Sequence, residues 1–344
     1  MTAPAPSLTH PLSVIIPTHN GAQYLRECLQ ALFAQTRGDF EAIVVDDAST
    51  DSTGEVLEGY PQVVNVRLEG RHGHGFVAAV NAGLARARGE IIVLLNNDAV
   101  PEPRWLEELM KALERNPWAG MAASRLMLYD RPDVFHSAGD YYGPNGLPDS
   151  RGVWQRDSGQ YDREEEVFGP CAAAAAYRRA VLVDVARCGG TQPPGHVLDP
   201  QLWMYCEDVD LNLRARLRGH HTVYVPTARV RHRLSATGGG PLASYYVGRN
   251  LIYLIAKDLP GRVILRNLPC MVSAQLRIAV QAVRHIREPA ARARLRGMLV
   301  GLLTWPRVLP ARRRLMRSAR LHPHEFEAML RRFSRQASRP DTIR

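Results

Sequence analysis

The feature that most constrains the fold of this 344-residue chain is an alternation of apolar runs with helical stretches between residues 12 and 119. Apolar runs with the length of buried strands begin near residues 12, 40, 63 and 90. The stretches 22–35 and 75–89 are helical in pattern, and 101–117 carries proline in its first turn, where helices tolerate it. Strands that alternate with helices predict an α/β domain built on a mainly parallel sheet flanked by helices on both faces.

Three of the predicted strands end in polar clusters, at Thr18–Asn20, Asp46–Ser49 and Asn96–Asp98. In open α/β sheets, ligands bind outside the carboxyl ends of the strands. Because buried polar groups cost free energy unless they find partners, clusters at these positions indicate a binding site. The turn-forming preference of Asn and Asp is the alternative explanation of each cluster taken alone.

The last cluster combines two side-chain amides, Asn96 and Asn97, with one carboxylate, Asp98. Mg²⁺ in proteins takes one or two carboxylates and completes its shell with water and phosphate oxygens. One aspartate is therefore enough for a divalent cation that also holds a diphosphate. Asp46 and Asp47 end another strand of the same sheet. Adjacent carboxylates repel, so one of them is expected to accept a hydrogen bond from a base imide or a backbone N–H.

The second part of the chain, residues 120–257, is less regular. Its Gly- and Pro-rich stretch 136–152 predicts a loop. A strand and a short helix are expected at 169–190, a helix at 201–220, and a strand followed by a loop at 221–240. His232 falls near the end of that last strand, between two arginines. A lone histidine more often has a structural role than a ligand role. His232 is a site candidate because Asp98 and Asp208 also lie at the ends of predicted elements.

The predicted helix at 201–220 carries Glu207, Asp208 and Asp210 within one turn, next to the aromatic Trp203 and Tyr205. Glu207 and Asp210, three residues apart, share a helix face, whereas Asp208 points elsewhere. A charged helix face is usually just solvated. Acids beside aromatic side chains also suit a general base in a partly desolvated pocket.

Charge is unevenly distributed along the chain. Residues 259–344 contain 19 arginines and four acidic residues, a net charge of +15, so the remainder carries −5 of the overall +10. Such asymmetry indicates an anionic partner for the tail, either a membrane or a nucleic acid. Nucleic acid is not expected as a partner, because no recognised nucleic-acid-binding module accompanies the charge.

The basic tail is amphipathic between residues 263 and 287. Arginines flank one predicted helical stripe, which consists of Leu268, Met271, Val272, Gln275, Leu276, Ala279 and Val283. An apolar patch at 297–310 includes Trp305 but has only 14 residues, fewer than a spanning helix needs, so no transmembrane segment is expected. The pattern predicts a region that lies in the headgroup layer of an anionic membrane. Helices packed on the domain, with solvated arginines, are the alternative.

The five cysteines show neither CxxC pairing nor metal-ligand spacing, which is typical of a reducing compartment. Residues 1–11 are Pro-rich and lack the pattern of a signal peptide, so a short disordered lead is expected. These features predict a cytoplasmic protein.

Several segments together resemble one known family. They read SVIIPTHNG, VVDDASTDST, GFVAAVNAGLARARGEIIVLLNNDAV, MYCEDVDLNLRARLRG and RVRHRLSATGG followed by YYVGRNLIY. Their order and spacing are similar to those of the family 2 glycosyltransferases, especially the rhamnosyltransferase-like branch, over residues 12–257. The resemblance implies a GT-A catalytic domain at 12–257, with a nucleotide-binding half (12–119) and an acceptor and catalytic half (120–257). An Arg-rich helical C-terminal region, 258–344, follows it.

The resemblance also implies roles for individual residues. Asp47 is expected to contact the pyrimidine base. Asp98 and His232 are expected to bind the metal, with Asn96 at the place of the first Asp of the family's DxD motif. Asp208 is expected to be the catalytic base, with Glu207 beside it. Further expected nucleotide-binding residues are Pro17, Thr18, Asn20, Asp46, Arg71 and Asn97, and expected sugar contacts are Trp203, Tyr205 and Arg249.

The expected activity is inverting transfer of a sugar from dTDP-rhamnose or a UDP-sugar to a hydroxyl of a glycan or lipid-linked acceptor, assisted by Mg²⁺ or Mn²⁺. Such a hexosyltransferase is expected to act in cell-surface polysaccharide synthesis. It is expected to lie in the cytoplasm, peripherally on the inner face of the membrane. A non-catalytic sugar-nucleotide-binding protein and a nucleotidyltransferase are the alternatives. The second lacks support, because the N-terminal region has no Gly-rich, basic loop for a triphosphate.

Overall fold

The computed structural model describes residues 11–188, 190–191, 195–234 and 239–337, so the predicted lead lies almost wholly outside them. The strands are β1 (Leu12–Thr18), β2 (Phe40–Asp47), β3 (Val64–Leu68), β4 (Ile91–Leu95), β5 (Ala99–Pro101), β6 (Ala119–Leu128), β7 (Phe135–Ser137), β8 (Asp140–Tyr142), β9 (Pro148–Ser150), β10 (Glu165–Val167), β11 (Ala174–Arg178) and β12 (His221–His232). The α-helices are α1 (Ala22–Phe33), α2 (Thr53–Glu58), α3 (Phe76–Arg86), α4 (Trp105–Arg115), α5 (Arg179–Arg187), α6 (Glu207–Leu217), α7 (Gly240–Asp258), α8 (Gly261–Arg284), α9 (Pro289–Thr304), α10 (Leu309–Ser318) and α11 (Pro323–Ala337).

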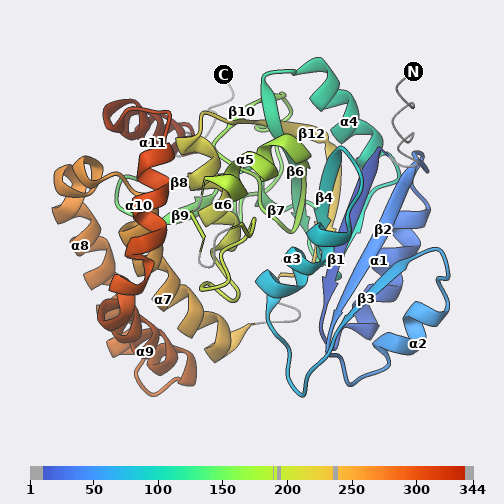
Figure 1. The fold of residues 1–344 in the computed structure, drawn as a ribbon, viewed down its shortest axis with the longest axis horizontal. Helices are drawn as coiled ribbons and strands as arrows, with labels where there is room; N and C mark the ends of the chain where they lie inside the picture. The colour runs from blue at the N-terminus through green and yellow to red at the C-terminus, as the bar shows by residue number, and fades with distance from the viewer. Residues whose placement is uncertain (1–10, 189, 192–194, 235–238, 338–344) are drawn as a thin grey trace, which may run out of the picture.

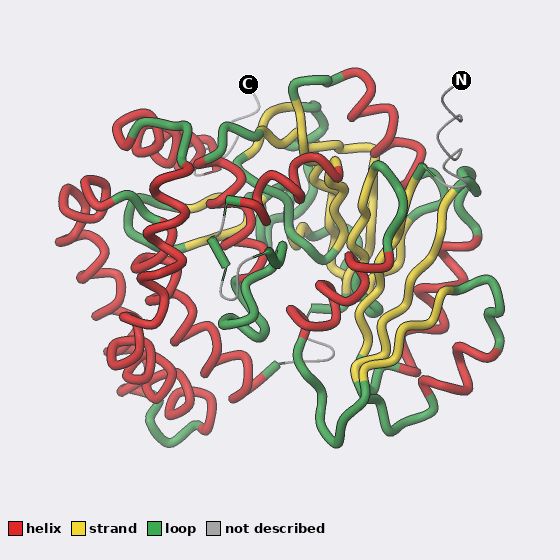
Figure 2. The backbone as a smooth tube through the Cα atoms, in the orientation of Figure 1, coloured by secondary structure: helices red, strands yellow, loops and turns green. Residues whose placement is uncertain are grey.

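One ten-stranded sheet forms the centre of the molecule (Figure 2). Its main path runs β10-β12-β6-β11-β4-β1-β2-β3, while β5 pairs with β12 and β7 with β6. Helices cover the sheet, and α7 to α11 gather at the end of the molecule away from β3 (Figure 1). The predicted α/β fold with a helical C-terminal region is confirmed.

The strands β1 to β4 are parallel, and β1, β2 and β4 are apolar because both of their faces are covered, whereas the edge strand β3 is largely exposed. Val14 and Ile16 of β1 pack in the core that includes α1 and α4, whereas Ile15 packs on the opposite face with α3 and α5. In the register of β1 and β2, Thr18 lies opposite Asp46. The polar clusters predicted at these two strand ends are therefore neighbours.

The other half of the sheet is mixed in direction, so the parallel arrangement is confined to β1–β4 and the β6–β12 pair. β11 runs antiparallel between β4 and β6, and β12 runs parallel to β6. The short strand β5 pairs antiparallel with β12, which places His232 opposite Ala99. This pairing brings His232 next to Asp98, although the two are far apart in sequence.

Two predicted elements differ in the structure. The loop expected at 136–152 contains the end of β7 and the β8–β9 hairpin, in which Asp140 lies opposite Ser150. The helix expected at 201–220 begins only at Glu207. Residues 201–205 do not join it, because α7 side chains hydrogen-bond their carbonyl oxygens.

The C-terminal helices share a core with residues 120–257. Leu259, Val263, Phe326 and Phe333 pack in one cluster with Phe168. A 3₁₀ turn at Trp305–Val308 connects α9 to α10. Among the described helices, α8 is long and apolar enough to cross a membrane by length and composition alone, a test that core helices also pass.

Candidate active site

The end of β4 and the end of β12 bring three metal-ligand candidates together. Asp98 Oδ1 lies 3.1 Å from His232 Nε2, and both side chains are buried. The Asn96 amide nitrogen lies 3.5 Å from the same imidazole nitrogen, and Asn96 Oδ1 is buried without a hydrogen-bond partner. Two oxygen donors and one imidazole suit Mg²⁺ or Mn²⁺. The residues predicted to bind metal therefore fit one.

A second histidine orients His232. The Nδ1 atoms of His136 and His232 are 3.1 Å apart, and the two rings stack with centroids 4.9 Å apart. Burial, followed by the charge of His232, lowers the pKa of His136 to about 3, so His136 is neutral and can accept a hydrogen bond. If His232 donates from Nδ1, its Nε2 lone pair faces Asp98, which is the tautomer that a metal ligand needs.

A pocket of about 290 Å³ opens beside these residues at the carboxyl ends of β1, β2 and β4. Of the residues predicted to bind the nucleotide, four line it: Pro17, Thr18, Asp47 and Asn97. The Asn97 amide donates to Thr18 Oγ1 at 2.9 Å, which fixes both side chains. The volume and the concave, mostly apolar lining are those of a small-molecule site.

Asp47 is held by the loop before α3. Its Oδ1 accepts from His74 N–H at 2.7 Å and lies 2.9 Å from His74 Nδ1, and its Oδ2 accepts from Gly75 N–H at 2.8 Å. A carboxylate has about four acceptor positions, so one remains for a ligand. The partner expected for one of the paired aspartates is thus a backbone N–H.

The other three residues predicted to bind the nucleotide lie outside the pocket lining. Asn20 has φ +50° and accepts from Thr50 N–H at 2.7 Å, so it shapes the loop after β1. Asp46 accepts from Ser49 N–H at 2.9 Å and pairs with Arg67 at 3.2 Å. Arg71 is exposed.

The segment before α6 has an unusual backbone. Trp203, Tyr205 and Cys206 all have φ between +64° and +65°, a region that costs free energy for residues other than glycine. The Asn250 amide nitrogen donates to the carbonyl oxygens of Leu202, Met204 and Tyr205, at 2.7–3.0 Å. These bonds explain why the chain does not enter the helix until Glu207.

Arg249, an expected sugar contact, is engaged in the same clamp. Its Nη2 donates to the carbonyl oxygens of Gln201 and Leu202 at 2.7 and 2.9 Å. Trp203, another expected sugar contact, lines the pocket and stacks on Tyr246 with centroids 4.7 Å apart. Of these two residues, the tryptophan is the one that lines a space open to a ligand.

The three acids of the α6 N-terminus have different surroundings. Asp210 is fully buried and pairs with Arg214 at 2.7 Å; burial alone would raise its pKa, but Arg214 and Lys257 lower it. Burial, followed by the charge of Asp208, raises the pKa of Glu207 to about 8. Burial also raises the pKa of Asp208, but the N–H groups of Ala172 and Val209 oppose that rise. Asp208 is therefore the better candidate for an ionised base.

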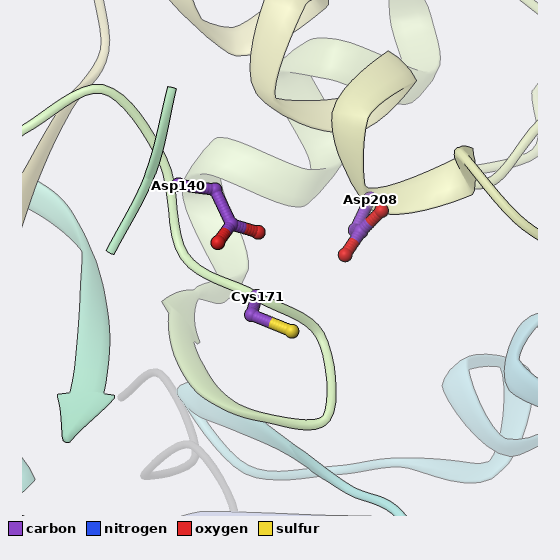
Figure 3. A group of neighbouring side chains, drawn as sticks. All are labelled: Asp140, Cys171 and Asp208. Carbon is purple, nitrogen blue, oxygen red and sulfur yellow. The ribbon is translucent and has the colours of Figure 1, made fainter. Parts of the chain in front are cut away.

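Asp208 faces two residues that no motif identified. The ligand atoms of Asp140, Cys171 and Asp208 all lie within 4.8 Å of one another, and their side chains converge on one space (Figure 3). Three such groups can hold a metal by geometry. Burial raises the pKa of the Cys171 thiol well above its usual range, however, and a neutral thiol is a poor ligand for a hard cation. The trio is better suited to proton transfer.

The sequence did not identify Asp140 as a site residue, because Asp140 lies in a stretch that predicts a loop. It is buried, and its Oδ1 accepts from the hydroxyls of Ser137 and Ser150, both at 2.8 Å. Burial, followed by the charge of Asp208, raises its pKa to about 7. Two carboxylates this close share a strongly coupled titration.

The charges of Glu207 and Asp98 both act on the Tyr205 hydroxyl. Burial, followed by the charges of Glu207 and Asp98, raises the pKa of Tyr205 to about 12. The backbone connects the metal-ligand group with Asp208, since Asn96 N–H donates to Ala173 O and Ala172 N–H donates to Asp208 Oδ2. The metal-ligand group and the candidate base thus border one region of the molecule.

Comparisons with known proteins identify the family and the fold of the chain. An uncharacterized glycosyltransferase of Nostoc sp., alr2836, is 30% identical over 178 residues, which are 51% of this chain and 52% of that protein. The O-antigen biosynthesis protein RfbC of Myxococcus xanthus is 29% identical over 240 residues, 67% of this chain and 18% of that protein. The chain spans about half or less of the length of the first curated relatives that it matches.

Among solved structures, S. aureus TarS 1-349 superposes with a TM-score of 0.53 at 18% identity, covering 96% of this chain and 94% of that one. At this identity the likeness concerns the fold, which is GT-A. The family described as glycosyl transferase family 2 matches residues 13–185, half of the chain, and contains the ends of β1, β2 and β4 that form the pocket. The chain belongs to glycosyl transferase family 2.

Proposed function

We propose that this protein is an inverting, metal-assisted hexosyltransferase that uses a nucleotide-diphosphate sugar, dTDP-rhamnose or a UDP-sugar. The observation that carries the proposal is the backbone connection between the two groups: Asn96, whose side chain lies beside His232, donates its N–H to Ala173 O, and the adjacent Ala172 N–H donates to Asp208 Oδ2. Inversion needs a base on one face of the sugar and a stabilised leaving group on the other. A sugar-nucleotide-binding protein without activity would not need Asp208.

In the proposed reaction, the acceptor hydroxyl gives its proton to Asp208 as its oxygen bonds to the anomeric carbon. The bond from that carbon to the diphosphate breaks, and the electron pair leaves with the diphosphate. Asp98, His232 and Asn96 would hold a divalent cation, which stabilises the charge of the diphosphate when bound. Asp47 and Thr18 would orient the nucleotide in the pocket. Glu207, protonated near neutral pH, can donate a hydrogen bond.

The acceptor in this proposal is a hydroxyl of a glycan or of a lipid-linked glycan in cell-surface polysaccharide synthesis. The similarity to RfbC of Myxococcus xanthus, an O-antigen biosynthesis protein, supports this class. The basic tail supports a peripheral position on the cytoplasmic face of a membrane, where anionic lipids are available. The resemblance to the rhamnosyltransferase-like branch keeps dTDP-rhamnose among the proposed donors, beside UDP-sugars.

Donor use can be tested by thermal stabilisation. Nucleotide-sugars are screened against the purified protein with and without Mn²⁺, and donor hydrolysis is measured for each compound that raises the melting temperature. We expect one pyrimidine-diphosphate sugar to stabilise the protein in a metal-dependent manner and to be hydrolysed slowly. Full activity in EDTA would remove the metal from the mechanism.

The base can be tested by Asp208→Asn, which should leave donor binding intact and reduce turnover by on the order of 10²–10⁴-fold. Asp149→Asn changes an exposed acid of the nearby hairpin and serves as a matched control. Near-normal turnover in Asp208→Asn, with an inactive Glu207→Gln, would assign the base to Glu207 instead.

A further inference from the structure

The helix α8 has an apolar face that points away from the protein. Val263, Asn267 and Met271 face inward and are buried. On the other side, Leu265 is 73% exposed and Leu276 is 59% exposed. Large exposed apolar side chains recur along that side at Leu268, Val272, Val280 and Val283. Contiguous apolar surface of this kind marks an interaction site rather than ordinary surface.

The helix α9, which packs beside α8, also exposes apolar side chains at its C-terminal end. Leu303 is 70% exposed, and Leu299, Leu302 and Trp305 are also exposed. We call the exposed apolar side chains of α8, α9 and Trp305 the outer face. Met271, which the sequence placed on the exposed stripe, belongs to the buried side instead. Figure 1 shows α8 and α9 at the edge of the molecule opposite β3.

Positive charge borders the outer face. At about 100° per residue, Arg262, Arg277 and Arg284 fall together along one side of the α8 stripe, whereas Arg266 pairs with Glu327 of α11. Glu288 is the only acidic residue between positions 259 and 324 of the sequence. An apolar stripe with a cationic border and a tryptophan is the pattern of a helix that lies in the headgroup layer of a bilayer.

The inner face of α8 argues against a spanning orientation. Its Asn267 amide donates to Glu327 at 3.1 Å, and Arg331 of α11 donates to Asn267 Oδ1 at 2.8 Å. Removal of α8 from the protein would leave these buried polar groups without partners. The helix therefore has one side fixed to the protein and the other open to a surface.

We propose that the outer face of α8 and α9 is a docking surface for an anionic lipid bilayer, into which its leucines and Trp305 insert while the bordering arginines contact lipid phosphates. The inference adds a membrane-binding site to the proposed function and, for its role in catalysis, rests on that function. The arginine border and the near absence of acids from this part of the sequence select a bilayer over a second copy of this positively charged chain.

Docking at this surface would place the active site at a fixed height above the membrane. The helices α7 and α9 are in close contact: a Cβ added at Gly297 would lie 2.1 Å from Tyr245 O, and one at Gly248 would lie 2.6 Å from Arg294 O. α7 carries Asn250, which clamps the loop before Asp208. The docking surface and the acceptor side of the site thus share one rigid support.

The test uses the full chain and flotation with vesicles of phosphatidylcholine, alone or mixed with phosphatidylglycerol. The test variant is Leu276→Glu combined with Leu302→Glu, and the control is Val64→Glu combined with Val183→Glu. All four positions are exposed and apolar, and both variants change the charge equally, but Val64 and Val183 lie on β3 and α5. The C-terminal helices are retained, because they contribute to the core.

We expect the wild type and the control to float with the anionic vesicles only, and less at high salt. The fraction of the test variant that floats with anionic vesicles should be at least about tenfold lower than that of the wild type, because two charges would enter the apolar layer. Equal flotation of both variants, or flotation of the wild type with neither vesicle, would overturn the proposal. Dimers that dissociate in the test variant without any flotation would assign the outer face to a second copy.

Donor hydrolysis in detergent-free buffer separates this proposal from the proposed function. The test variant should hydrolyse the water-soluble donor at the wild-type rate, since no residue of the pocket is changed. Normal flotation without any hydrolysis would contradict the enzyme activity alone. Normal hydrolysis without flotation would contradict the docking surface alone.

Discussion

Replacement of Asp140 by asparagine should make the protein more stable at alkaline pH. The amide side chain of Asp140→Asn would keep an oxygen to accept from the hydroxyls of Ser137 and Ser150, so the hairpin geometry is retained. It would lose the negative charge that lies within 4.8 Å of Asp208. Because the perturbation removes a charge and preserves the shape of the side chain, its effect should depend on pH.

The magnitude follows from the pKa of Asp140, which burial and Asp208 raise to about 7. An unfolded aspartate titrates near 3.9. Between these values the folded protein binds more protons than the unfolded chain, so the stability of the wild type falls as pH rises from about 4 to about 7. A difference of roughly three pKa units corresponds to at most about 4 kcal/mol. Asp140→Asn lacks this loss and should gain on the wild type by up to that amount.

Urea unfolding at pH 5 and at pH 8 measures the part of the effect that lies between pH 5 and pH 7, about two pKa units or roughly 3 kcal/mol. The quantity compared is the change in unfolding free energy between the two pH values, in Asp140→Asn and in the wild type. Asp149→Asn, which changes an exposed acid of the same hairpin, should behave like the wild type. If Asp140→Asn loses as much stability on alkalisation as the wild type does, Asp140 is not protonated in the folded protein and the coupled pair is refuted.

Three further changes test other parts of the structure. His136→Phe keeps a ring against His232 but removes the acceptor, so about 10–100-fold more metal should be required for half-maximal donor hydrolysis; an unchanged metal requirement would count against this partner. Gly75→Ala should weaken nucleotide binding in calorimetry, because its φ is +94° and a Cβ would lie 2.7 Å from Trp203, whereas Gly38→Ala has open space and should bind normally. Lys257→Met should lower the unfolding free energy by about 3–5 kcal/mol in urea, since it removes the buried cation that lies 2.5 Å from Asp199, and a neutral effect would contradict that ion network.

The parallel half of the fold could be predicted because its signals are local. Val14 and Ile16 lie in an apolar run, and the residues after each run are polar, so both the strands and the edge that carries the site follow from the sequence. The pairing of Asp98 with His232 is expected only from the family resemblance, because the two residues are 134 positions apart. Composition and periodicity contain no information on such a contact.

The missed features depend on tertiary contacts. Asp140 and His136 lie in a stretch whose glycines and prolines indicate a loop, and only the β8–β9 hairpin and the position of His232 give them a role. The helix predicted from residue 201 fails because Asn250, more than 40 positions later, takes the carbonyl oxygens that a helix would use. Helix propensity depends on neighbouring residues only, so it does not account for the hydrogen bonds that Asn250 makes to these carbonyl oxygens.

The three residues with positive φ before α6 strain the backbone of the segment that leads to Asp208. Each of Trp203, Tyr205 and Cys206 stores about 1–3 kcal/mol of backbone strain. The bonds from Asn250 and Arg249 offset that strain only while α7 stays in position. A displacement of α7 by about an ångström would lengthen several of these bonds at once, and the segment would relax and carry Asp208 with it. The position of one helix therefore sets whether the proposed base, Asp208, is in place.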